Sequence, residues 1–131
     1  MKTYWDTSAI VLALTDANLR ERLADGHAVT RTHTLAELFS ALTKGTGEIR
    51  LSATDAAAMV ASVATDLAFV DLTSKEVLLT LEKANKKGVR GGRVHDLLHA
   101  AAADKANVAR LLTADQNDFL GLAEKAVPTT I

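Results

Sequence analysis

The sequence contains no cysteine, and aromatic residues make up only 4% of its 131 positions. The lack of cysteine excludes disulfide bridges and thiolate metal sites, and it is typical of a reducing compartment. With so few aromatics, leucine, valine and alanine must fill most of the core. The first apolar segment ends by Thr15, without a signal-peptide cleavage site and too short to span a membrane. We therefore expect a cytoplasmic protein with no membrane contact.

The chain also lacks an excess of charge of one sign. It has 15 Lys and Arg residues and 16 Asp and Glu residues, for a formal net charge of -1. This balance argues against a protein that coats nucleic acid indiscriminately, but it is compatible with a local basic patch. Hydrophobic residues make up 48% of the chain and charged residues 24%. These proportions are typical of a globular domain, and we assign residues 1–131 to a single domain.

Segments with a strand pattern alternate with segments that have the helical period. We expect strands at residues 3–5, 27–32, 67–72, 108–113 and 126–131, the last limited in its pairing by Pro128. We expect helices at residues 9–14, 16–25, 54–65, 93–106 and 117–123, one from residue 34 to the glycines at 45 and 47, and one from a capping box at 73–76 to Gly88. This alternation predicts an α/β fold with three α/β/α layers and a mostly parallel central sheet.

Four acids, Asp6, Glu37, Asp96 and Asp115, lie at strand ends or one turn into the next helix, and Asp118 follows closely. The carboxyl ends of parallel strands meet at one edge of a sheet, so these acids are expected to converge. Clustered carboxylates repel one another unless a divalent cation neutralises them, and all-oxygen ligation suits Mg²⁺ or Mn²⁺. Such an ion activates water for attack on a phosphodiester, which makes phosphodiester hydrolysis the predicted reaction.

Each acid also has a purely structural alternative. Asp6 and Asp115 are both placed to cap a following helix, and Glu37 is the third residue after Thr34 in a capping-box pattern. Asp96 is harder to explain in this way, because it interrupts an apolar helix where a buried carboxylate is costly. We expect Asp6 to point into a groove beside Asp96, rather than to cap the helix that follows.

Four fragments resemble, in order and spacing, the PIN-domain ribonucleases and among them the VapC toxins of type II toxin–antitoxin (VapBC) pairs. They are W-D-T-S-A-I-V from residue 5, T-L-A-E-L from residue 34, G-G-R-V-H-D-L-L-H-A-A-A-A from residue 91 and L-L-T-A-D-Q-N-D-F from residue 111. The resemblance covers essentially the whole chain. It implies a metal-dependent endoribonuclease that is neutralised by a cognate VapB-like antitoxin and forms a homodimer.

The resemblance also implies roles for individual residues. Asp6, Glu37, Asp96 and Asp115 match the catalytic acidic quartet, and we assign the metal to Asp6, Asp96 and Asp115. Hydroxyl groups that orient these carboxylates match Thr7 or Ser8 and Thr113, and Asp118 matches a second acid of the last motif, as a supporting or alternative ligand. Antitoxin and dimer contacts are expected on exposed faces of the helices at 9–14, 19–23 and 54–65.

A basic segment precedes Asp96 and is the candidate RNA-binding element. Arg93 is placed to hold a phosphate, and Arg90 and Lys87 add positive charge, although the lysines also suit a solvated helix end. His95 and His99 have the spacing of a zinc-binding helix, but no third ligand is evident, so one of them is expected at the rim of the site.

Two other functions are compatible with parts of the pattern. A receiver-like signalling domain also binds Mg²⁺ at an acid cluster, but it needs a second acid beside Asp6 and a lysine at a late strand end, and both are lacking. A non-catalytic RNA-binding protein with the same fold is the other alternative.

Overall fold

The computed structural model describes residues 1–44 and 50–131. Its strands are β1 (Thr3–Trp5), β2 (Ala28–Thr30), β3 (Ala68–Phe69), β4 (Arg110–Thr113) and β5 (Val127–Thr130). Its α-helices are α1 (Thr7–Thr15), α2 (Ala17–Leu23), α3 (His33–Thr43), α4 (Ala53–Ala64), α5 (Ser74–Glu82) and α6 (Val94–Lys105). Two 3₁₀ turns, η1 (Gly91–Arg93) and η2 (Gln116–Phe119), complete the order. The glycines at 45 and 47, expected to end the third helix, lie outside the described residues.

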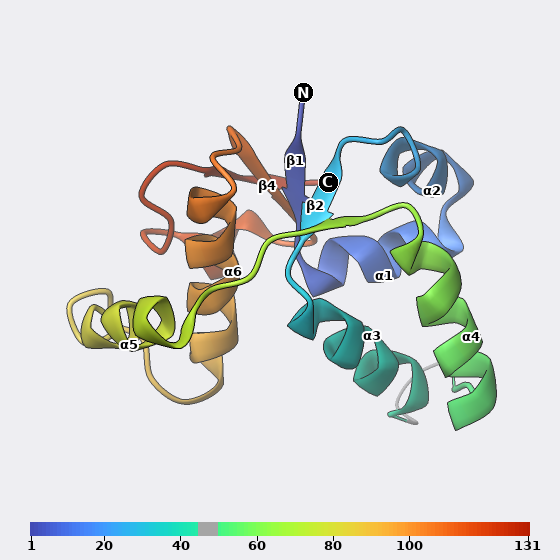
Figure 1. Ribbon diagram of the computed structural model, residues 1–131, viewed down its shortest axis with the longest axis horizontal. Coiled ribbons are helices and arrows are strands. Elements are labelled where there is room, and N and C mark those ends of the chain that lie inside the picture. The colour runs from blue at the N-terminus through green and yellow to red at the C-terminus, as the bar shows by residue number, and fades with distance from the viewer. Residues whose placement is uncertain (45–49) are drawn as a thin grey trace.

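The five strands form one sheet in the order β3-β2-β1-β4-β5. Every neighbouring pair is parallel, with β1 at the centre. The helices cover both faces, α5 and α6 on one side and α1 to α4 on the other (Figure 1). The predicted α/β fold with a three-layer arrangement is therefore confirmed, and the sheet is entirely parallel.

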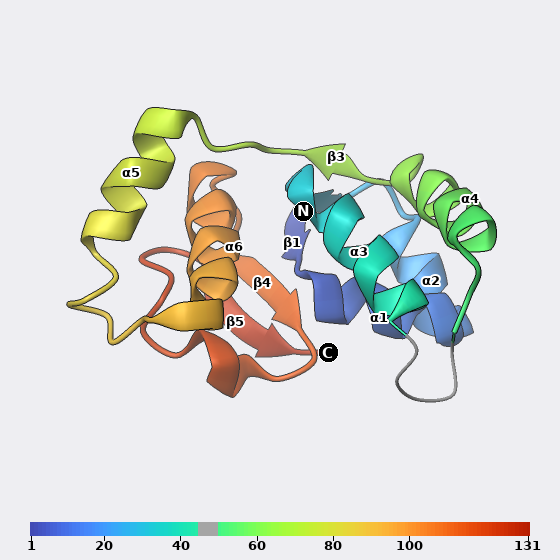
Figure 2. The same cartoon turned by 90° about the horizontal axis from the view of Figure 1, so that it is seen from below.

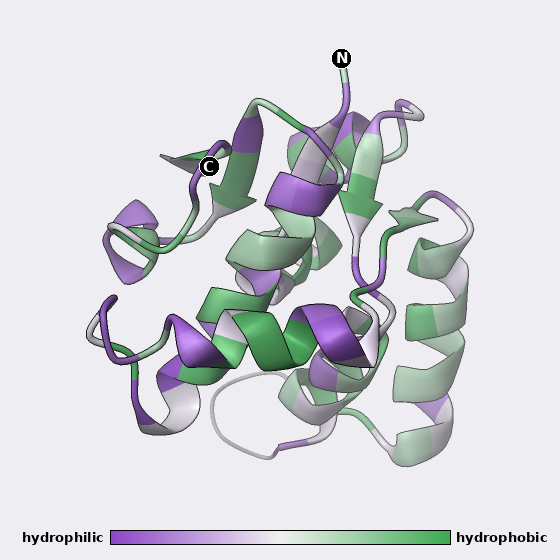
Figure 3. Cartoon of the chain, turned by 60° about the vertical axis from the view of Figure 1, so that its left-hand side comes forward, coloured by the Kyte–Doolittle hydropathy of each residue, from purple (hydrophilic) through white to green (hydrophobic). Residues whose placement is uncertain are grey.

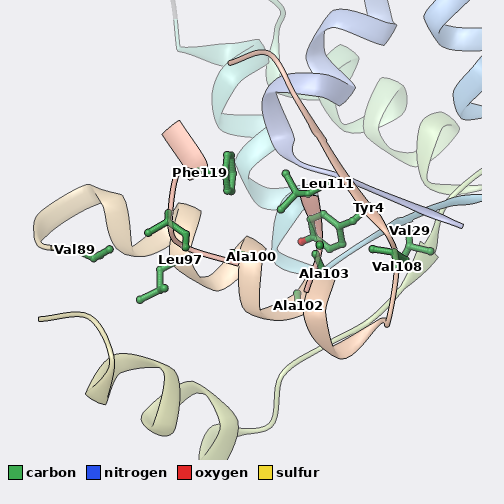
Figure 4. Close-up of a cluster of buried hydrophobic side chains, with 12 residues drawn as sticks. Tyr4, Val29, Val89, Leu97, Ala100, Ala102, Ala103, Val108, Leu111 and Phe119 are labelled. Carbon is green, nitrogen blue, oxygen red and sulfur yellow. The ribbon is translucent and has the colours of Figure 1, made fainter. Parts of the chain in front are cut away.

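Alternation along the strands divides the interior into two cores, one on each face of the sheet. Tyr4, Val29 and Leu111 face α6, where they pack with its alanines and with Phe119 (Figure 4). Their chain neighbours Trp5, Ala28 and Leu112 point to the opposite face and pack with α1, α3 and α4. The small alanines of α6 allow this helix to lie close to the sheet.

One predicted helix start is formed by the expected side chains. Thr73 accepts a hydrogen bond from the backbone N–H of Glu76, whose carboxylate accepts one from the Thr73 N–H, which is the predicted capping box. Asp16 and Ser52 cap α2 and α4 through one bond each, from the backbone N–H groups of Leu19 and Asp55. The chain between α4 and α5 crosses the molecule through β3 (Figure 2).

Several predicted elements are shorter than expected, among them β2, which covers Ala28–Thr30 of the expected 27–32. The strand at 67–72 is reduced to two exposed residues at a sheet edge, because β3 has a neighbour on only one side. Helix α5 ends at Glu82, not at Gly88, and the segment up to Gly88 continues as turns. The expected helix at 117–123 is the single 3₁₀ turn η2.

Pro128 does not limit the pairing of β5 with β4, contrary to our expectation. All four residues of β5 are in register with β4, and Leu111 lies opposite Pro128. The N–H groups of Val127 and Ile131 donate to β4-side carbonyls, so the alternating pattern turns the proline nitrogen to the outer edge. No helix within the described ranges is long and apolar enough to cross a bilayer.

Candidate functional site

A pocket of about 500 Å³ lies where β1 and β4 end, beside the first turns of α1, α3 and α6. Its polar lining consists of Asp6, Thr7, Ser8, Glu37, Asp96, His99 and Asp118, and Val11, Leu12, Ala41 and Ala114 supply the apolar part. The structure thus brings together three of the four predicted catalytic acids, Asp6, Glu37 and Asp96. Asp115 is not part of this lining, and Asp118 is.

Asp6 both caps a helix and lines the pocket. Its Oδ1 accepts hydrogen bonds from the Ala9 backbone N–H over 2.8 Å and from the Ser8 hydroxyl over 2.7 Å. The expectation that Asp6 does not cap α1 is therefore wrong, because a residue directly before a helix meets the free N–H groups of its first turn. The residue is only 5% exposed, so its carboxylate is held firmly at the pocket.

Ser8 connects the ends of β1 and β4. Its hydroxyl proton goes to Asp6, and its oxygen accepts from the Ala114 N–H over 2.9 Å. The buried hydroxyl of Thr113 lies 3.3 Å from the same oxygen. Ser8 and Thr113 therefore belong to one hydrogen-bonded group that fixes Asp6 from the side of β4.

Glu37 takes no part in a capping box. Thr34 is buried and bonds to Thr30, and the first turn of α3 has no side-chain cap. Oε1 of Glu37 instead accepts from the Thr7 hydroxyl over 3.1 Å and from Nε2 of His99 over 2.9 Å. Thr7 therefore supports Glu37, whereas Ser8 supports Asp6.

The pKa of Glu37 is shifted by these contacts. Burial opposes ionisation, but the hydrogen bond and electrostatic attraction from His99, the positive charge of Arg31 at 3.7 Å and the Thr7 hydroxyl together lower the pKa to about 2. Glu37 is therefore a fully ionised carboxylate at neutral pH.

Asp96 shows the opposite behaviour. Burial is the main cause that raises its pKa, and the negative charges of Asp118 and Asp6 raise it further, against the opposing effects of His99 and Arg93. Three carboxylates thus gather in the pocket with too little positive charge to balance them.

Asp115 is engaged as the cap of η2, where its Oδ1 accepts from the Asn117 N–H over 3.0 Å. Its own N–H faces Thr113 at 3.4 Å. The tight 3₁₀ geometry after β4 places Asp118, one turn later, in the pocket wall.

The donor chemistry of the pocket fits a hard divalent cation, with carboxylate oxygens from Asp6 and Asp96 and uncompensated negative charge around them. Within the described residues, no group of three or more acidic or histidine side chains is arranged to hold a metal ion.

The three predicted RNA-binding residues lie in different surroundings. Arg93 in η1 is exposed, and its Nη2 donates to the Asp118 carbonyl over 3.3 Å, which holds it at the acidic side of the pocket. Arg90 is exposed just before η1. Lys87 is mostly buried, because its ammonium donates to the Leu122 carbonyl over 2.7 Å and lies 3.7 Å from Glu124.

The two histidines of α6 have different partners. His95 is exposed and stacks on His33 with ring centroids 6.2 Å apart and an interplanar angle of 15°. His99 is buried between Tyr4 and Glu37. The two rings therefore do not face a common metal position.

The sequence pattern did not indicate Tyr4, Arg31 or the role of His99 as parts of the site. The positions of Tyr4 at a strand centre and of His99 among alanines signal burial, and a buried imidazole requires polar partners. Arg31 directly follows a strand, but nothing in the sequence indicates that its side chain turns inward toward Glu37.

Comparison with known proteins agrees with this architecture. The model of the PIN domain family matches residues 3–125. The crystal structure of PAE2754 from Pyrobaculum aerophilum superimposes on the chain with a TM-score of 0.71, at 17% identity, covering 98% of this chain and 89% of that chain. No curated protein sequence matches at a significant level.

The likeness to PAE2754 concerns the fold alone, because the identity is low. The family match extends over nearly the whole chain and does not favour a receiver-like signalling domain. PIN domains are in general nucleases that depend on divalent metal ions. The chain belongs to the PIN domain family.

Proposed function

We propose that this PIN domain is an endoribonuclease that hydrolyses phosphodiester bonds in RNA with Mg²⁺ or Mn²⁺. The observation that carries the proposal is the gathering of Asp6, Glu37, Asp96 and Asp118 in one pocket, where burial, and then the charges of Asp118 and Asp6, raise the pKa of Asp96. Such an arrangement is costly for folding and is typical of a site that binds a cation.

Asp6 and Asp96 are the proposed protein ligands of the cation. Asp115 completes the ligand set in the proposal, and Asp118, which lines the pocket, is the alternative for the same position. When bound, the cation lowers the pKa of a water molecule and stabilises the charge on the phosphate. Glu37 is ionised, and its Oε1 is held by hydrogen bonds. Its role in the proposal is to orient the attacking water molecule or a water molecule bound to the cation.

The test is cleavage of a 5′-labelled structured RNA with Mg²⁺ or Mn²⁺, followed by electrophoresis. We expect Asp6→Ala and Asp96→Asn each to lower the rate at least 100-fold, a loss of about 2.7 kcal/mol or more in transition-state stabilisation. The matched control is Asp16→Asn, which makes the same chemical change at the exposed cap of α2, where asparagine also caps well. Unchanged cleavage in both pocket variants would refute the site assignment.

Asp115→Asn and Asp118→Asn, measured in parallel, decide between the two alternatives for the third carboxylate. We expect the ligand variant to weaken Mn²⁺ binding in calorimetry and to lower cleavage, and the other variant to change cleavage much less.

Arg93 and Arg90 are proposed to contact the RNA backbone. The contact with the Asp118 carbonyl holds Arg93 at the acidic side of the pocket. A guanidinium at this position can donate hydrogen bonds to a phosphate of the RNA next to the cation. The contacts of Lys87 with Leu122 and Glu124 give it a smaller part in RNA binding. Removing Arg93 is expected to raise KM and to reduce the salt dependence of binding more than removing Lys87.

For the biological role we propose a toxin of a type II toxin–antitoxin pair, neutralised in the cytoplasm by a VapB-like antitoxin. Support comes from the family and from the resemblance of the four sequence fragments to VapC toxins. Induced expression should arrest bacterial growth, Asp96→Asn should abolish the arrest, and co-expression of a small neighbouring gene product should relieve it.

A homodimer is also part of the proposal, and exposed leucines mark the surface to test. Leu78, Leu79 and Leu81 of α5 are 63%, 47% and 42% exposed, and α5 has no buried residue. Figure 3 shows the hydrophobic band on this helix. Sedimentation of Leu78→Glu, compared with Met59→Glu on α4, distinguishes α5 from the helices favoured by the sequence.

A non-catalytic RNA-binding protein is the alternative within the same fold. It would bind RNA with the same affinity with or without Mn²⁺ and would show no heat of metal binding.

A further inference from the structure

A row of three hydrogen-bonded side chains runs from the central strand to the pocket. The Tyr4 hydroxyl lies 2.7 Å from Nδ1 of His99, and Nε2 of the same ring lies 2.9 Å from Oε1 of Glu37. Tyr4 and His99 are 0% and 2% exposed. The row therefore connects β1, α6 and α3 through the interior, and its outer end is a side chain of the pocket.

The direction of the hydrogen bonds follows from the end groups. A carboxylate is ionised at neutral pH and can only accept, so Nε2 of His99 carries a proton and donates it to Glu37. A phenol keeps its proton at neutral pH, and in the neutral ring Nδ1 is the acceptor, so the Tyr4 hydroxyl donates to Nδ1. Tyr4 lies deep among apolar side chains of this face (Figure 4), where its hydroxyl needs a partner.

All of these contacts with Glu37 end on one carboxylate oxygen. Oε1 receives the bonds from Thr7 at 3.1 Å and His99 at 2.9 Å, and Nη2 of Arg31 approaches it to 3.7 Å. Thr7 and His99 are themselves 3.4 Å apart. Within the described part of the chain, Oε2 receives none of the hydrogen bonds to Glu37, so it is free for a ligand in the pocket.

We propose that Tyr4 and His99 are a positioning pair that holds the Glu37 carboxylate in one orientation, with Oε2 presented to the pocket. His99 acts through Glu37 and does not itself touch the reacting groups. The catalytic consequence rests on the proposed nuclease function, whereas the hydrogen-bonded row can be tested without it. Fixing a group to within a fraction of an ångström matters because misplacement by 1 Å costs about 100-fold in rate.

The test compares two replacements of His99. Glutamine places an amide N–H near the position of Nε2 and keeps a donor for Glu37, whereas leucine fills a similar volume without a donor. We expect His99→Leu to lower kcat by about 10- to 100-fold with little change in KM, and His99→Gln to stay within about threefold of wild type. A purely structural role would not separate the two variants in this way.

Leucine at position 99 also leaves the Tyr4 hydroxyl without its partner, which lowers stability. The double variant Tyr4→Phe with His99→Leu removes both polar groups and is expected to recover most of the melting temperature. We expect kcat to remain low in this variant, because Glu37 still lacks its donor. Recovery of kcat together with stability would overturn the proposal, as would equal activity of His99→Leu and His99→Gln.

An NMR measurement separates failure of this proposal from failure of the nuclease function. Protein labelled with ¹⁵N-histidine should show a protonated Nε2 and an acceptor Nδ1 for His99. Glu37→Ala should move the Nε2–H resonance, and Tyr4→Phe should move the Nδ1 resonance. If the wild type cleaves no RNA but these shifts occur, the positioning pair stands and the nuclease proposal falls. An Nε2–H signal unaffected by Glu37→Ala overturns the positioning pair, whatever the activity.

Discussion

The Ser8 hydroxyl donates to Oδ1 of Asp6 over 2.7 Å while its oxygen accepts from the backbone N–H of Ala114 over 2.9 Å. One side chain therefore joins the carboxylate after β1 to the backbone after β4. The backbone pairing of β1 with β4 sets the distance between the strand ends, and Ser8 adds a side-chain link that fixes the orientation of the Asp6 carboxylate.

Ser8→Ala should weaken both folding and cleavage. We expect a loss of about 1 to 2 kcal/mol in the free energy of unfolding, because two partly buried hydrogen bonds are lost, and about a tenfold slower cleavage, because Asp6 becomes less fixed. Urea unfolding and single-turnover cleavage measure the two effects. The control is Thr43→Ala, which removes the hydrogen bond from the Thr43 hydroxyl to the Phe39 carbonyl outside the pocket and should cleave normally.

Asp96→Asn should raise the melting temperature of the protein in chelator, although it abolishes cleavage. The folded state raises the pKa of Asp96, so its charge opposes folding at neutral pH, and a neutral amide removes that cost. The rise is read from thermal unfolding, where each 1 kcal/mol of stabilisation corresponds to about 4 °C for a chain of this size. Adding Mn²⁺ should stabilise the wild type and leave Asp96→Asn almost unchanged. A lower melting temperature for the variant in chelator would contradict this account.

Stability should fall in acid in a manner that depends on Glu37. Its folded pKa of about 2 lies below its usual value of 4.5, so the stabilisation is complete above pH 4.5 and is lost as the pH falls toward 2. The contribution is up to about 3 kcal/mol, from the size of the shift. Urea unfolding between pH 2 and pH 6 should therefore show a shallower pH dependence for Glu37→Gln than for wild type.

Glu76→Gln provides the comparison for that experiment. The pKa of Glu76 is also lowered to about 2, by Lys105 and the Thr73 N–H, but Glu76 lies on α5 away from the acidic pocket. In both variants the free energy of unfolding should depend less on pH in acid than in wild type. Only Glu37→Gln should impair cleavage. Identical pH dependence in wild type and Glu37→Gln would contradict the assignment.

Asp104 on α6 should contribute to the stability of the fold and should have no part in cleavage. Its carboxylate accepts from the backbone N–H groups of Glu124, Lys125 and Ala126 and so fixes the segment that leads into β5. Asp104→Ala should cost about 2 to 4 kcal/mol in unfolding free energy, whereas Asp104→Asn, which keeps one acceptor oxygen, should cost less. RNA cleavage at a temperature where both variants remain folded should equal that of wild type.

The sequence was sufficient to predict the layers of the fold because hydrophobic periodicity reports burial directly. Tyr4 and Trp5 are successive apolar residues of a short strand, and they face the two different cores. The length of β3 could not be predicted in the same way. The run around Phe69 has strand character, but only two residues pair, since the extent of an edge strand is set by its single neighbour.

Asp6 directly follows β1, and Glu37 and Asp96 lie near the amino ends of α3 and α6. These positions were enough to predict that the three acids share one pocket, because ligands bind at the carboxyl edge of a parallel sheet. Position in the chain could not separate Asp115 from Asp118. These acids are three residues apart, and the turn geometry of η2 decides which side chain lines the pocket. The contact of His99 with Glu37 joins residues 62 positions apart in the chain, and the contact of Arg31 with Glu37 depends on a side chain that turns inward after β2. No local pattern encodes either contact.

The outward-facing nitrogen of Pro128 has a consequence for assembly. A neighbouring chain that adds a strand to a sheet needs a free row of N–H and C=O groups, and β5 presents a gap in that row. At the opposite edge, β3 pairs over only two residues and offers a template too short for stable extension. The sheet is thus capped against growth at both ends, and any copy or partner that binds this protein must do so through its helices and loops.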